Sequence, residues 1–401
     1  MKHILILLNI FVFVFSFGLS AQQQTADGGY VIAGSGNSFT HGMHDLFVFK
    51  LDATGKKQWR KNYGGLQDEL SGFVKQTADG GYILCGCSFS YTNGSSDILV
   101  YKLNATGAKQ WRKNYGGDMM EMLYGVIQTA DTGYAVSGTS SSYTSDGNRD
   151  FIVYKLDASG AKQWRKTYGG EYFDSRPYIQ QTTDGGYILG GSTQTYTHGG
   201  VDFLAYKLDA AGKKQWRRNY GGTGADEGRV IRQTADGGYV FAGYGESYPT
   251  MPNAEVPVPA IPGDMLVYKL NAAGMKQWRK NLGGSKIDKI EDIWQTSDGG
   301  YLVTGYSTSF SGGCYDYLIF KLDATGAKQW RKTYGGDKTD YASFGFQTSD
   351  GGYLIYGDSY SYSNTGSDRD VLVYKVDATG KKQWRKNYGG SGYEDVPGGG
   401  C

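Results

Sequence analysis

One short pattern recurs along the whole chain and limits what the chain can fold into. The pattern is Gln-Thr-x-Asp-Gly-Gly-Tyr, and it begins at Gln24, Gln76, Gln181, Gln233, Gln295 and Gln347, with a variant at Gln128 in which Thr132 replaces the first glycine. A fixed period of about 52 residues is typical of a repeat protein, in which neighbouring units bury a shared core. The chain therefore contains seven copies of one unit.

A second pattern, Lys-Gln-Trp-Arg, recurs in register with the first. It places one tryptophan in each unit: Trp59, Trp111, Trp164, Trp216, Trp278, Trp330 and Trp384. Among the tryptophans, only Trp294 lies outside this register. The two patterns thus mark two fixed points in every unit.

Each unit has the pattern of four short strands. In the unit that contains Gln76, we expect strands at 70–77, 82–86, 97–103 and 109–115, with tight turns at 78–81 and 104–107. The 63 glycines and 34 tyrosines suit many strands joined by tight turns. Four antiparallel strands per unit are typical of a propeller blade. We predict an all-β, seven-bladed β-propeller that spans residues 22–401 as a single domain.

The N-terminus has the features of a secretory signal peptide at residues 1–21. A charged start at Lys2 precedes the apolar run 4–19, and Ala21 offers a cleavage site. The alternative is an uncleaved membrane anchor, because the apolar run is just long enough to span a bilayer. No later segment is apolar enough to cross a bilayer. We therefore expect a secreted, cell-surface or periplasmic protein whose mature chain has no transmembrane segment.

Charge and cysteine content narrow the possible partners. Lys plus Arg number 41 and Asp plus Glu number 39, so no strong overall field attracts nucleic acid, and we expect none as a partner. Cys85 and Cys87 share one strand face, and Cys314 lies four units away, so we predict no structural disulfide. Cys-x-Cys lacks further metal ligands nearby. We expect no metal and no cofactor, with calcium left open.

The two ends of the chain are expected to share one blade. If the signal peptide is removed, the first unit lacks most of its innermost strand. After Trp384 the chain repeats Asn-Tyr-Gly-Gly and continues to Glu394, as in the segment that leads into every other inner strand. We predict a Velcro-type closure between the N- and C-terminal segments. Pro397 and the glycines after it make the end of that strand weak.

The segment Leu51-Asp52-Ala53-Thr54-Gly55-Lys56-Lys57-Gln58-Trp59 resembles the tryptophan-docking motif of quinoprotein-like (PQQ-like) propellers, with one residue fewer between Asp and Thr-Gly. The resemblance implies that each tryptophan locks onto a turn of a neighbouring blade. The repeats after the signal peptide also resemble the Asp-Gly-Gly-Tyr repeats of secreted bacterial and archaeal proteins. This second resemblance specifies the architecture but no activity, and neither implies a quinone cofactor.

The candidate binding residues lie on one face of the expected disc. The tight turns fall on one face, and the longer, more variable loops fall on the other, which we take as the working face. A carboxylate stands beyond each Gly-Gly pair: Glu69, Glu121, Asp174, Asp226, Asp288, Asp340 and Glu394. An aromatic residue stands in each loop after the second strand: Phe39, Tyr91, Tyr143, Tyr196, Tyr248, Phe310 and Tyr362.

Two interpretations of these residues remain open. Carboxylates around a channel mouth, together with aromatic rings, would suit a carbohydrate, a cation or a basic protein segment. Residues that recur in every blade are equally explained by packing between blades or by capping of backbone N–H groups. The proline-rich segment 249–262 breaks the symmetry, and its two interpretations are a contact for a partner and a neutral insertion.

The sequence favours binding over catalysis. Beyond the signal peptide only His41, His44 and His198 remain, and they form no evident triad or three-histidine metal site. The seven equivalent acids single out no catalytic pair. We predict a non-catalytic protein-interaction or structural scaffold module. A carbohydrate- or surface-polymer-binding module is the alternative, followed by a polysaccharide-active enzyme. The sequence does not indicate the oligomeric state.

Overall fold

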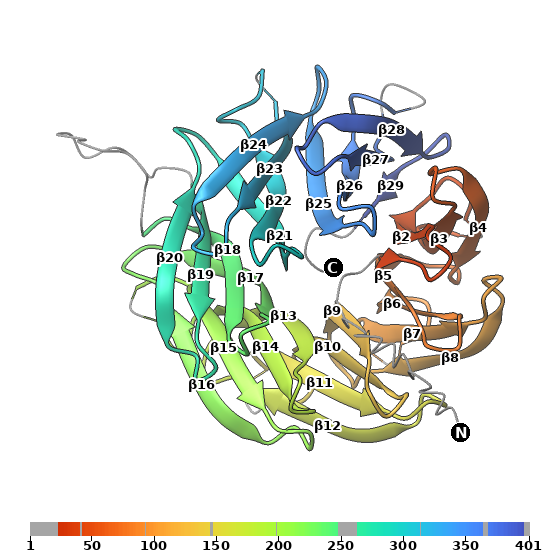
Figure 1. Ribbon diagram of the computed structural model, residues 1–401. Coiled ribbons are helices and arrows are strands. Elements are labelled where there is room, and N and C mark those ends of the chain that lie inside the picture. The colour runs from red at the N-terminus through yellow and green to blue at the C-terminus, as the bar shows by residue number, and fades with distance from the viewer. Residues whose placement is uncertain are drawn as a thin grey trace, which may run out of the picture.

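The computed structural model describes residues 23–40, 42–92, 94–144, 147–197, 199–247, 263–312, 314–363 and 368–396. Seven antiparallel sheets surround a central axis, six with four strands and one with five (Figure 1). This confirms the predicted seven-bladed β-propeller. The predicted signal peptide (1–21), the whole proline-rich segment 249–262, His41 and His198 lie outside the described residues.

Within each blade the strands run in chain order from the axis to the rim. The inner strands are β1 (Gln23–Gln24), β5 (Glu69–Gln76), β9 (Glu121–Gln128), β13 (Asp174–Gln181), β17 (Asp226–Gln233), β21 (Asp288–Gln295), β25 (Asp340–Gln347) and β29 (Glu394–Asp395). The second strands are β2 (Tyr30–Gly36), β6 (Tyr82–Ser88), β10 (Tyr134–Ser140), β14 (Tyr187–Thr193), β18 (Tyr239–Gly245), β22 (Tyr301–Ser307) and β26 (Tyr353–Ser359).

The third strands are β3 (Asp45–Leu51), β7 (Asp97–Leu103), β11 (Asp150–Leu156), β15 (Asp202–Leu208), β19 (Asp264–Leu270), β23 (Asp316–Leu322) and β27 (Asp370–Val376). The outer strands are β4 (Lys57–Tyr63), β8 (Lys109–Tyr115), β12 (Lys162–Tyr168), β16 (Lys214–Tyr220), β20 (Lys276–Leu282), β24 (Lys328–Tyr334) and β28 (Lys382–Tyr388). We number the blades one to seven in this order. Second and third strands are buried almost throughout, because blades stack face to face, whereas each outer strand begins with two exposed residues.

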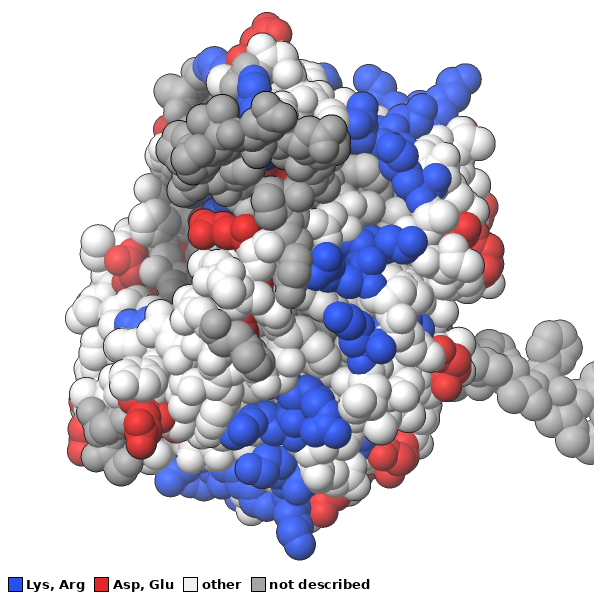
Figure 2. Space-filling view, turned by 90° about the vertical axis from the view of Figure 1, so that its left-hand side faces the viewer, with Lys and Arg blue, Asp and Glu red and all other residues white. Residues whose placement is uncertain are grey.

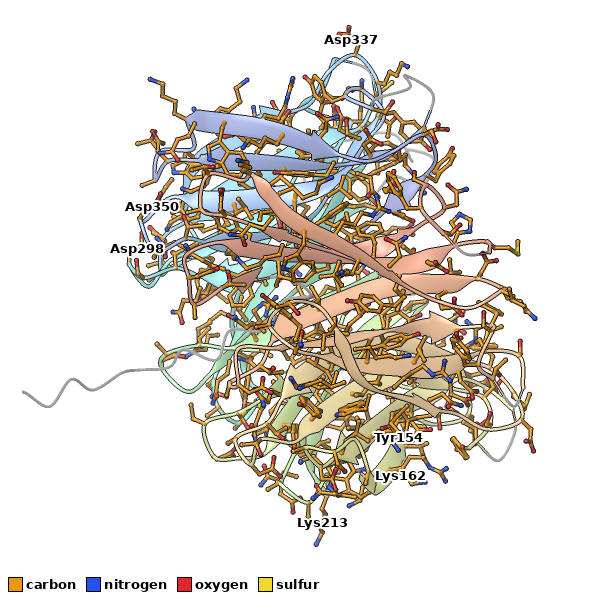
Figure 3. All side chains as sticks on the ribbon, turned by 90° about the vertical axis from the view of Figure 1, so that its right-hand side faces the viewer. Tyr154, Lys162, Lys213, Asp298, Asp337 and Asp350 are labelled. Carbon is orange, nitrogen blue, oxygen red and sulfur yellow. The ribbon has the colours of Figure 1, made fainter. Side chains whose placement is uncertain are left out.

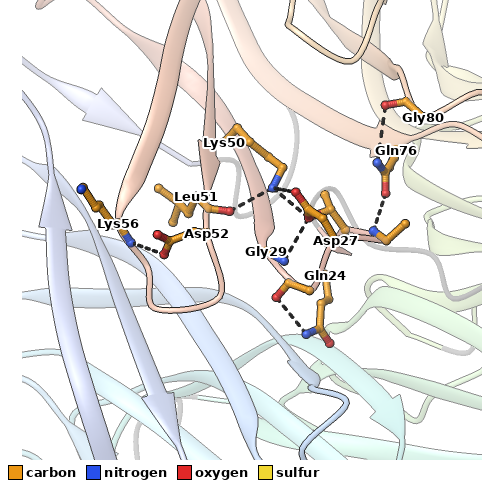
Figure 4. Close-up of polar contacts among 12 residues, drawn as sticks. Gln24, Asp27, Gly29, Lys50, Leu51, Asp52, Lys56, Gln76 and Gly80 are labelled. Carbon is orange, nitrogen blue, oxygen red and sulfur yellow. Dashed lines mark hydrogen bonds and ion pairs between the residues drawn. The ribbon is translucent and has the colours of Figure 1, made fainter.

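The Asp-Gly-Gly turn joins three strands of its own blade. In blade one, Asp27 accepts hydrogen bonds from Gly29 N–H and from Lys50 of the third strand, and Lys50 also donates to Leu51 O (Figure 4). Burial alone would raise the pKa of Asp27, but the hydrogen bonds from Lys50, Thr25 and Gly29 outweigh it and lower the pKa to about 2. The same lysine–aspartate pair recurs in all seven blades at 2.7 to 2.9 Å.

The glutamine that begins the first pattern of each repeat joins neighbouring blades. Gln76 of blade two accepts a hydrogen bond from Ala26 N–H of blade one, and the same contact follows at every junction at 2.8 to 2.9 Å. The last contact runs from Ser349 N–H to Gln24 and returns to the first blade. These bonds form a closed belt on the face that carries the tight turns, which we call the turn face. Asp298 and Asp350 mark this face in Figure 3.

The tryptophans dock onto the next blade. The contact is with the glycine in the turn between the third and outer strands, as for Trp59 of blade one and Gly107 of blade two. At every junction a Cβ added to this glycine would lie 2.8 to 3.2 Å from the indole ring of the preceding blade. The indole ring also contacts the tyrosine of the Asp-Gly-Gly-Tyr pattern, with centroids 5.7 Å apart for Trp59 and Tyr82. The two recurring sequence patterns therefore contact each other across every blade junction, as the docking motif implies.

Both chain ends complete the first blade. β1 pairs with the start of β2, where Gln23 faces Val31, and β29 pairs with its end, where Asp395 faces Ser35. The inner strand of blade one is thus assembled from two short pieces that come from opposite ends of the described chain. This is the predicted Velcro closure.

The prediction of no disulfide is wrong for Cys87. This buried residue is disulfide-bonded, whereas Cys85 and Cys314 are free. The spacing of cysteines along the sequence excluded a bond between Cys85 and Cys87. It did not predict that Cys87 takes part in a bond of its own.

Candidate functional site

The seven predicted acids start the inner strands, but their side chains are buried. Each of Glu69, Glu121, Asp174, Asp226, Asp288, Asp340 and Glu394 has 0% of its surface exposed. In blade two, Glu69 accepts hydrogen bonds from Gly65 N–H at 2.7 Å and from the Ser88 hydroxyl at 2.8 Å. Equivalent caps hold the loop that follows the Gly-Gly pair in most blades. This geometry favours the structural interpretation, and ligand binding by these acids stays a prediction.

A second carboxylate lies near each of these acids. A Cβ added to Gly64 would lie 2.0 Å from Oδ1 of Asp45 and 2.5 Å from Oε2 of Glu69. Two acids from neighbouring blades therefore flank the same glycine, which leaves no room for a side chain between them. Burial, and then the charge of Asp340, raise the pKa of Asp316 to about 6, and burial raises the pKa of Asp174 to about 7.

The predicted aromatic residues lie on the loop face, opposite the turn face, and an arginine of the same blade covers their rings. The guanidinium carbon lies 3.4 to 4.1 Å from the ring centroid in the six pairs of the described residues. Tyr91 also donates its hydroxyl proton to Gly64 O of the preceding blade at 2.8 Å. These contacts favour a packing role. Tyr248 lies outside the described residues, and binding by the other six stays a prediction.

The structure brings together a different set of residues that breaks the sevenfold symmetry. The sixth residue of the second strand is small in blades one to four but large or charged in blades five to seven: Ser35, Cys87, Thr139 and Ser192, then Tyr244, Tyr306 and Asp358. These positions lie at the loop-face end of their strands. Sequence reasoning looked for residues common to all blades and missed this set, which an aligned comparison of the seven units would have found.

One member of this set, Tyr306, packs against two further tyrosines, Tyr315 and Tyr341. The ring of Tyr306 lies 4.9 Å from that of Tyr341 and 5.3 Å from that of Tyr315, measured between centroids. Tyr315 and Tyr341 are themselves 5.3 Å apart. All three are half-buried, so part of each ring faces solvent. We call these residues, together with Tyr244, the tyrosine cluster.

Charged groups surround the tyrosine cluster. Arg229 lies over the Tyr244 ring at 5.1 Å and pairs with Glu291 at 3.6 Å, and Lys289 lies 4.7 Å from the same ring. Burial raises the pKa of Glu291 and of Tyr244, the latter to about 12, although the neighbouring cations act in the opposite direction. The cluster therefore combines phenol groups with both signs of charge in a partly dehydrated setting.

The cluster continues to the ring seam. Arg369 pairs with Asp358 at 3.6 Å and with Asp395 of β29 at 3.3 Å, and it lies over the ring of Tyr393 at 5.4 Å. Burial, and then the nearby Asp395 carboxylate, raise the pKa of Asp358 well above its usual range. The closing strand thus supplies residues to the same patch.

Exposed apolar side chains gather on the same face. Eight large hydrophobic residues are exposed in the described part of the chain, and seven of them lie in loop-face segments: Phe39, Met43, Leu66, Met119, Tyr172, Phe173 and Tyr393. Leu66 is 80% exposed, and Tyr172 is 57% exposed. The eighth, Met275, lies in a turn between β19 and β20 on the opposite face. Among the described residues, the loop face therefore carries most of the exposed large apolar side chains.

The axis of the ring is filled near the turn face. Arg232 pairs with Asp292 at 2.7 Å and lies 3.7 Å over the Trp294 ring, and Trp294 also donates to Asp292 at 2.7 Å. Arg232 and Asp292 are 3% and 1% exposed. This network explains the tryptophan that lies outside the repeat register: it helps pack the centre of the ring.

No group of three or more His, Cys, Asp or Glu side chains in the described residues is placed to hold a metal ion. His44 forms a 2.8 Å contact with Asp68 in the loops of blades one and two.

No helix within the described residues has the length and apolar character needed to cross a bilayer.

No family model matches the sequence, and no curated protein matches it. The fold is similar to several solved structures. A puromycin hydrolase is 10% identical with a TM-score of 0.56, covering 95% of this chain and 55% of that chain. The β-propeller domain of the Trilobed protease from Pyrococcus furiosus is 9% identical with a TM-score of 0.51, covering 93% and 96%. The Synechocystis apocarotenoid oxygenase is 11% identical with a TM-score of 0.50, covering 94% of each chain. At these identities the likeness concerns the fold alone.

Proposed function

We propose that the protein is a non-catalytic interaction module that binds a protein partner through its loop face. The observation that carries the proposal is the placement of exposed apolar residues: seven of the eight in the described chain lie on this face. Apolar side chains gathered on one face of a soluble domain are typical of a protein contact surface. The opposite face consists of tight turns tied together by the glutamine belt.

The composition of the loop face supports the same proposal. Tyrosine and arginine are among the residues that contribute most often to binding energy in protein interfaces. Here Tyr306, Tyr315 and Tyr341 pack together beside Arg229 and Lys289, and Leu66, Met119 and Phe173 project from loops of the first blades. A partner that covered both regions would bury an apolar area and a polar, tyrosine-rich area.

The experiment compares substitutions on the two faces. Leu66→Glu combined with Phe173→Glu places two charges within the proposed interface, and Met275→Glu, at a residue of similar exposure on the turn face, is the matched control. Wild-type protein and Met275→Glu should capture the same partner from envelope extracts, and the double variant should lose it. Capture that is equal for all three proteins would contradict the proposal.

A carbohydrate ligand is the second candidate, because the tyrosine cluster places aromatic rings beside charged groups. Aromatic rings cover the apolar faces of sugars, and charged side chains bind their hydroxyl groups. A glycan-array screen of wild-type protein and Tyr341→Ala would test it. A specific signal that Tyr341→Ala abolishes would favour a sugar, and no signal from folded protein would count against one.

We further propose that the protein is exported, on the basis of the charged, apolar and small-residue regions of residues 1–21. N-terminal sequencing of the mature protein should find a chain that begins just after Ala21. A mature chain that retains Met1 would contradict cleavage.

A further inference from the structure

We propose that the rim between the third and fourth blades binds an acidic polysaccharide. A surface hollow of about 460 Å³ lies at this junction. Four cations line it: Arg165 and Lys166 from β12, and Lys213 and Lys214 from the next blade. Tyr143, Thr167, Tyr168 and Gly212 complete the lining, which contains no acidic residue. Lys213 marks this part of the rim in Figure 3, and Lys162 marks the start of β12 at the neighbouring junction.

Two cations of the hollow, Arg165 and Lys166, are held in place by contacts that do not neutralise them. Arg165 lies 3.4 Å over the Tyr143 ring, and Lys166 donates to Ala211 O at 2.7 Å. Within the described residues, none of the four cations forms an ion pair with a carboxylate. Asp209 lies in the adjacent turn and accepts the backbone N–H of Lys213 at 2.7 Å. Counting that acid still leaves an excess of positive charge for an anionic ligand.

The chemistry of the hollow fits a sugar polymer that carries carboxylate or sulfate groups. The planar guanidinium of Arg165 can hold such a group through two parallel hydrogen bonds, while lysines supply mobile positive charge. The exposed hydroxyl of Thr167 can hydrogen-bond to a sugar hydroxyl. One hollow of this size would hold only a short segment of a polymer.

The rim offers further cations along the path of a polymer. Every outer strand begins with an exposed lysine: Lys57, Lys109, Lys162, Lys214, Lys276, Lys328 and Lys382. Figure 2, which views the rim from the side of β16 and β20, shows the basic side chains as successive patches. A flexible polysaccharide can follow this convex surface. A flat membrane would meet it on one side only, and duplex DNA resists such tight bending.

The chain contains its own comparison sites. At the junction of blades two and three, Ala161 stands where Lys213 stands here, and Asn114 stands where Thr167 stands. At the junction of blades six and seven, Thr333, Lys381 and Lys382 repeat the set of the proposed site. We therefore expect the junction of blades six and seven to bind the same polymer, and the junction of blades two and three to bind it less well.

The test measures binding of the folded mature chain to polygalacturonate and dextran sulfate, with uncharged dextran as the negative probe. Both acidic polymers should bind at low salt and weaken as salt rises, because salt screens the cations. Combining Lys213→Ala with Lys381→Ala should weaken binding about tenfold, and Ala161→Lys should strengthen it about threefold. Lys286→Ala removes an exposed cation from the loop face and should leave affinity within about twofold of wild type.

Three outcomes would overturn the proposal. The first is failure of the wild-type protein to bind either acidic polymer. The second is a loss of affinity in Lys286→Ala equal to that of the double variant, since binding would then follow net charge and not the site. The third is stronger binding to phosphatidylglycerol vesicles than to both polysaccharides. Thermal unfolding of each variant establishes that it is folded before binding is measured.

Discussion

Trp384 of the last blade packs on Gly55 in the first blade, so a contact that joins neighbouring blades throughout the molecule also joins the two ends of the chain. A Cβ at Gly55 would lie 2.8 Å from Cη2 of Trp384, and Tyr388 donates its hydroxyl proton to Gly55 O. Within the described residues, β29 pairs with two residues of β2. The docked tryptophan therefore contributes to a seam that few backbone hydrogen bonds hold.

Gly55→Ala should destabilise the protein more than Gly80→Ala. Both glycines have positive φ, +75° and +79°, so either substitution should lower the free energy of unfolding by about 1 kcal/mol. Nothing lies within 4 Å of a Cβ at Gly80, whereas one at Gly55 meets the indole ring. The resulting overpacking should cost a further 1 to 3 kcal/mol, roughly. Urea unfolding measures the difference, and equal losses would show that the docking contact is unimportant.

Leu282→Tyr should stabilise the fifth blade. Six outer strands end in a tyrosine whose hydroxyl donates to the turn glycine of the next blade, as Tyr220 does to Gly274 O at 2.7 Å. Leu282 interrupts this series. A tyrosine there should donate to Gly326 O and raise the free energy of unfolding by about 1 kcal/mol. Leu282→Phe supplies the ring without the hydroxyl and is the control. A gain that phenylalanine matches would assign the effect to packing.

Thr132→Gly should raise stability. Thr132 occupies the turn position that is glycine in the other six repeats, and its φ is +66°. A β-branched residue is strained in this region of backbone space, so glycine should stabilise the fold by about 1 kcal/mol. The reverse change, Gly80→Thr, should cost a similar amount at the equivalent turn. Thermal unfolding of the two variants provides the measurement, and a loss of stability in Thr132→Gly would be inconsistent with backbone strain.

Asp174→Asn should raise stability increasingly as pH rises. Burial raises the pKa of Asp174 from 3.8 to about 7 in the folded protein. Because the folded state holds this proton more tightly than the unfolded state does, protonation of Asp174 stabilises the fold. This stabilisation is fully present below pH 3.8 and is lost as pH rises through about 7. The stability of the variant relative to wild type should therefore increase between pH 4 and pH 7 and level off above. A difference that is independent of pH would contradict the shifted pKa.

The strand pattern could be predicted from the sequence, because every unit repeats it. The expected strands at 97–103 and 109–115 coincide with β7 and β8, and the expected 70–77 differs from β5 by one residue at each end. The second strand extends two residues beyond the predicted end, to Ser88, because pairing with β7 continues to Asp97. Alternating patterns report which residues form strands, but the end of a strand depends on its neighbour.

The candidate site was harder to predict because function in a repeat protein resides where the repeats differ. The carboxylates shared by all blades are buried, as is Glu69, and the six described aromatic residues are covered by arginines, as is Tyr91. Tyr306 and Tyr341 come from different strands of different blades, and only the closed ring places their rings 4.9 Å apart. The sequence shows that these residues depart from the repeat, but not that they meet.

The most direct test of the central claim, that a protein partner binds the loop face, is site-specific photo-crosslinking in living cells. A benzophenone amino acid placed at Tyr172 would report on the loop face, and one at Met275 would report on the turn face with nearly equal exposure, 57% against 55%. The account predicts a discrete crosslinked product from position 172 and none from position 275. A product from position 275 alone, or from neither position, would contradict it.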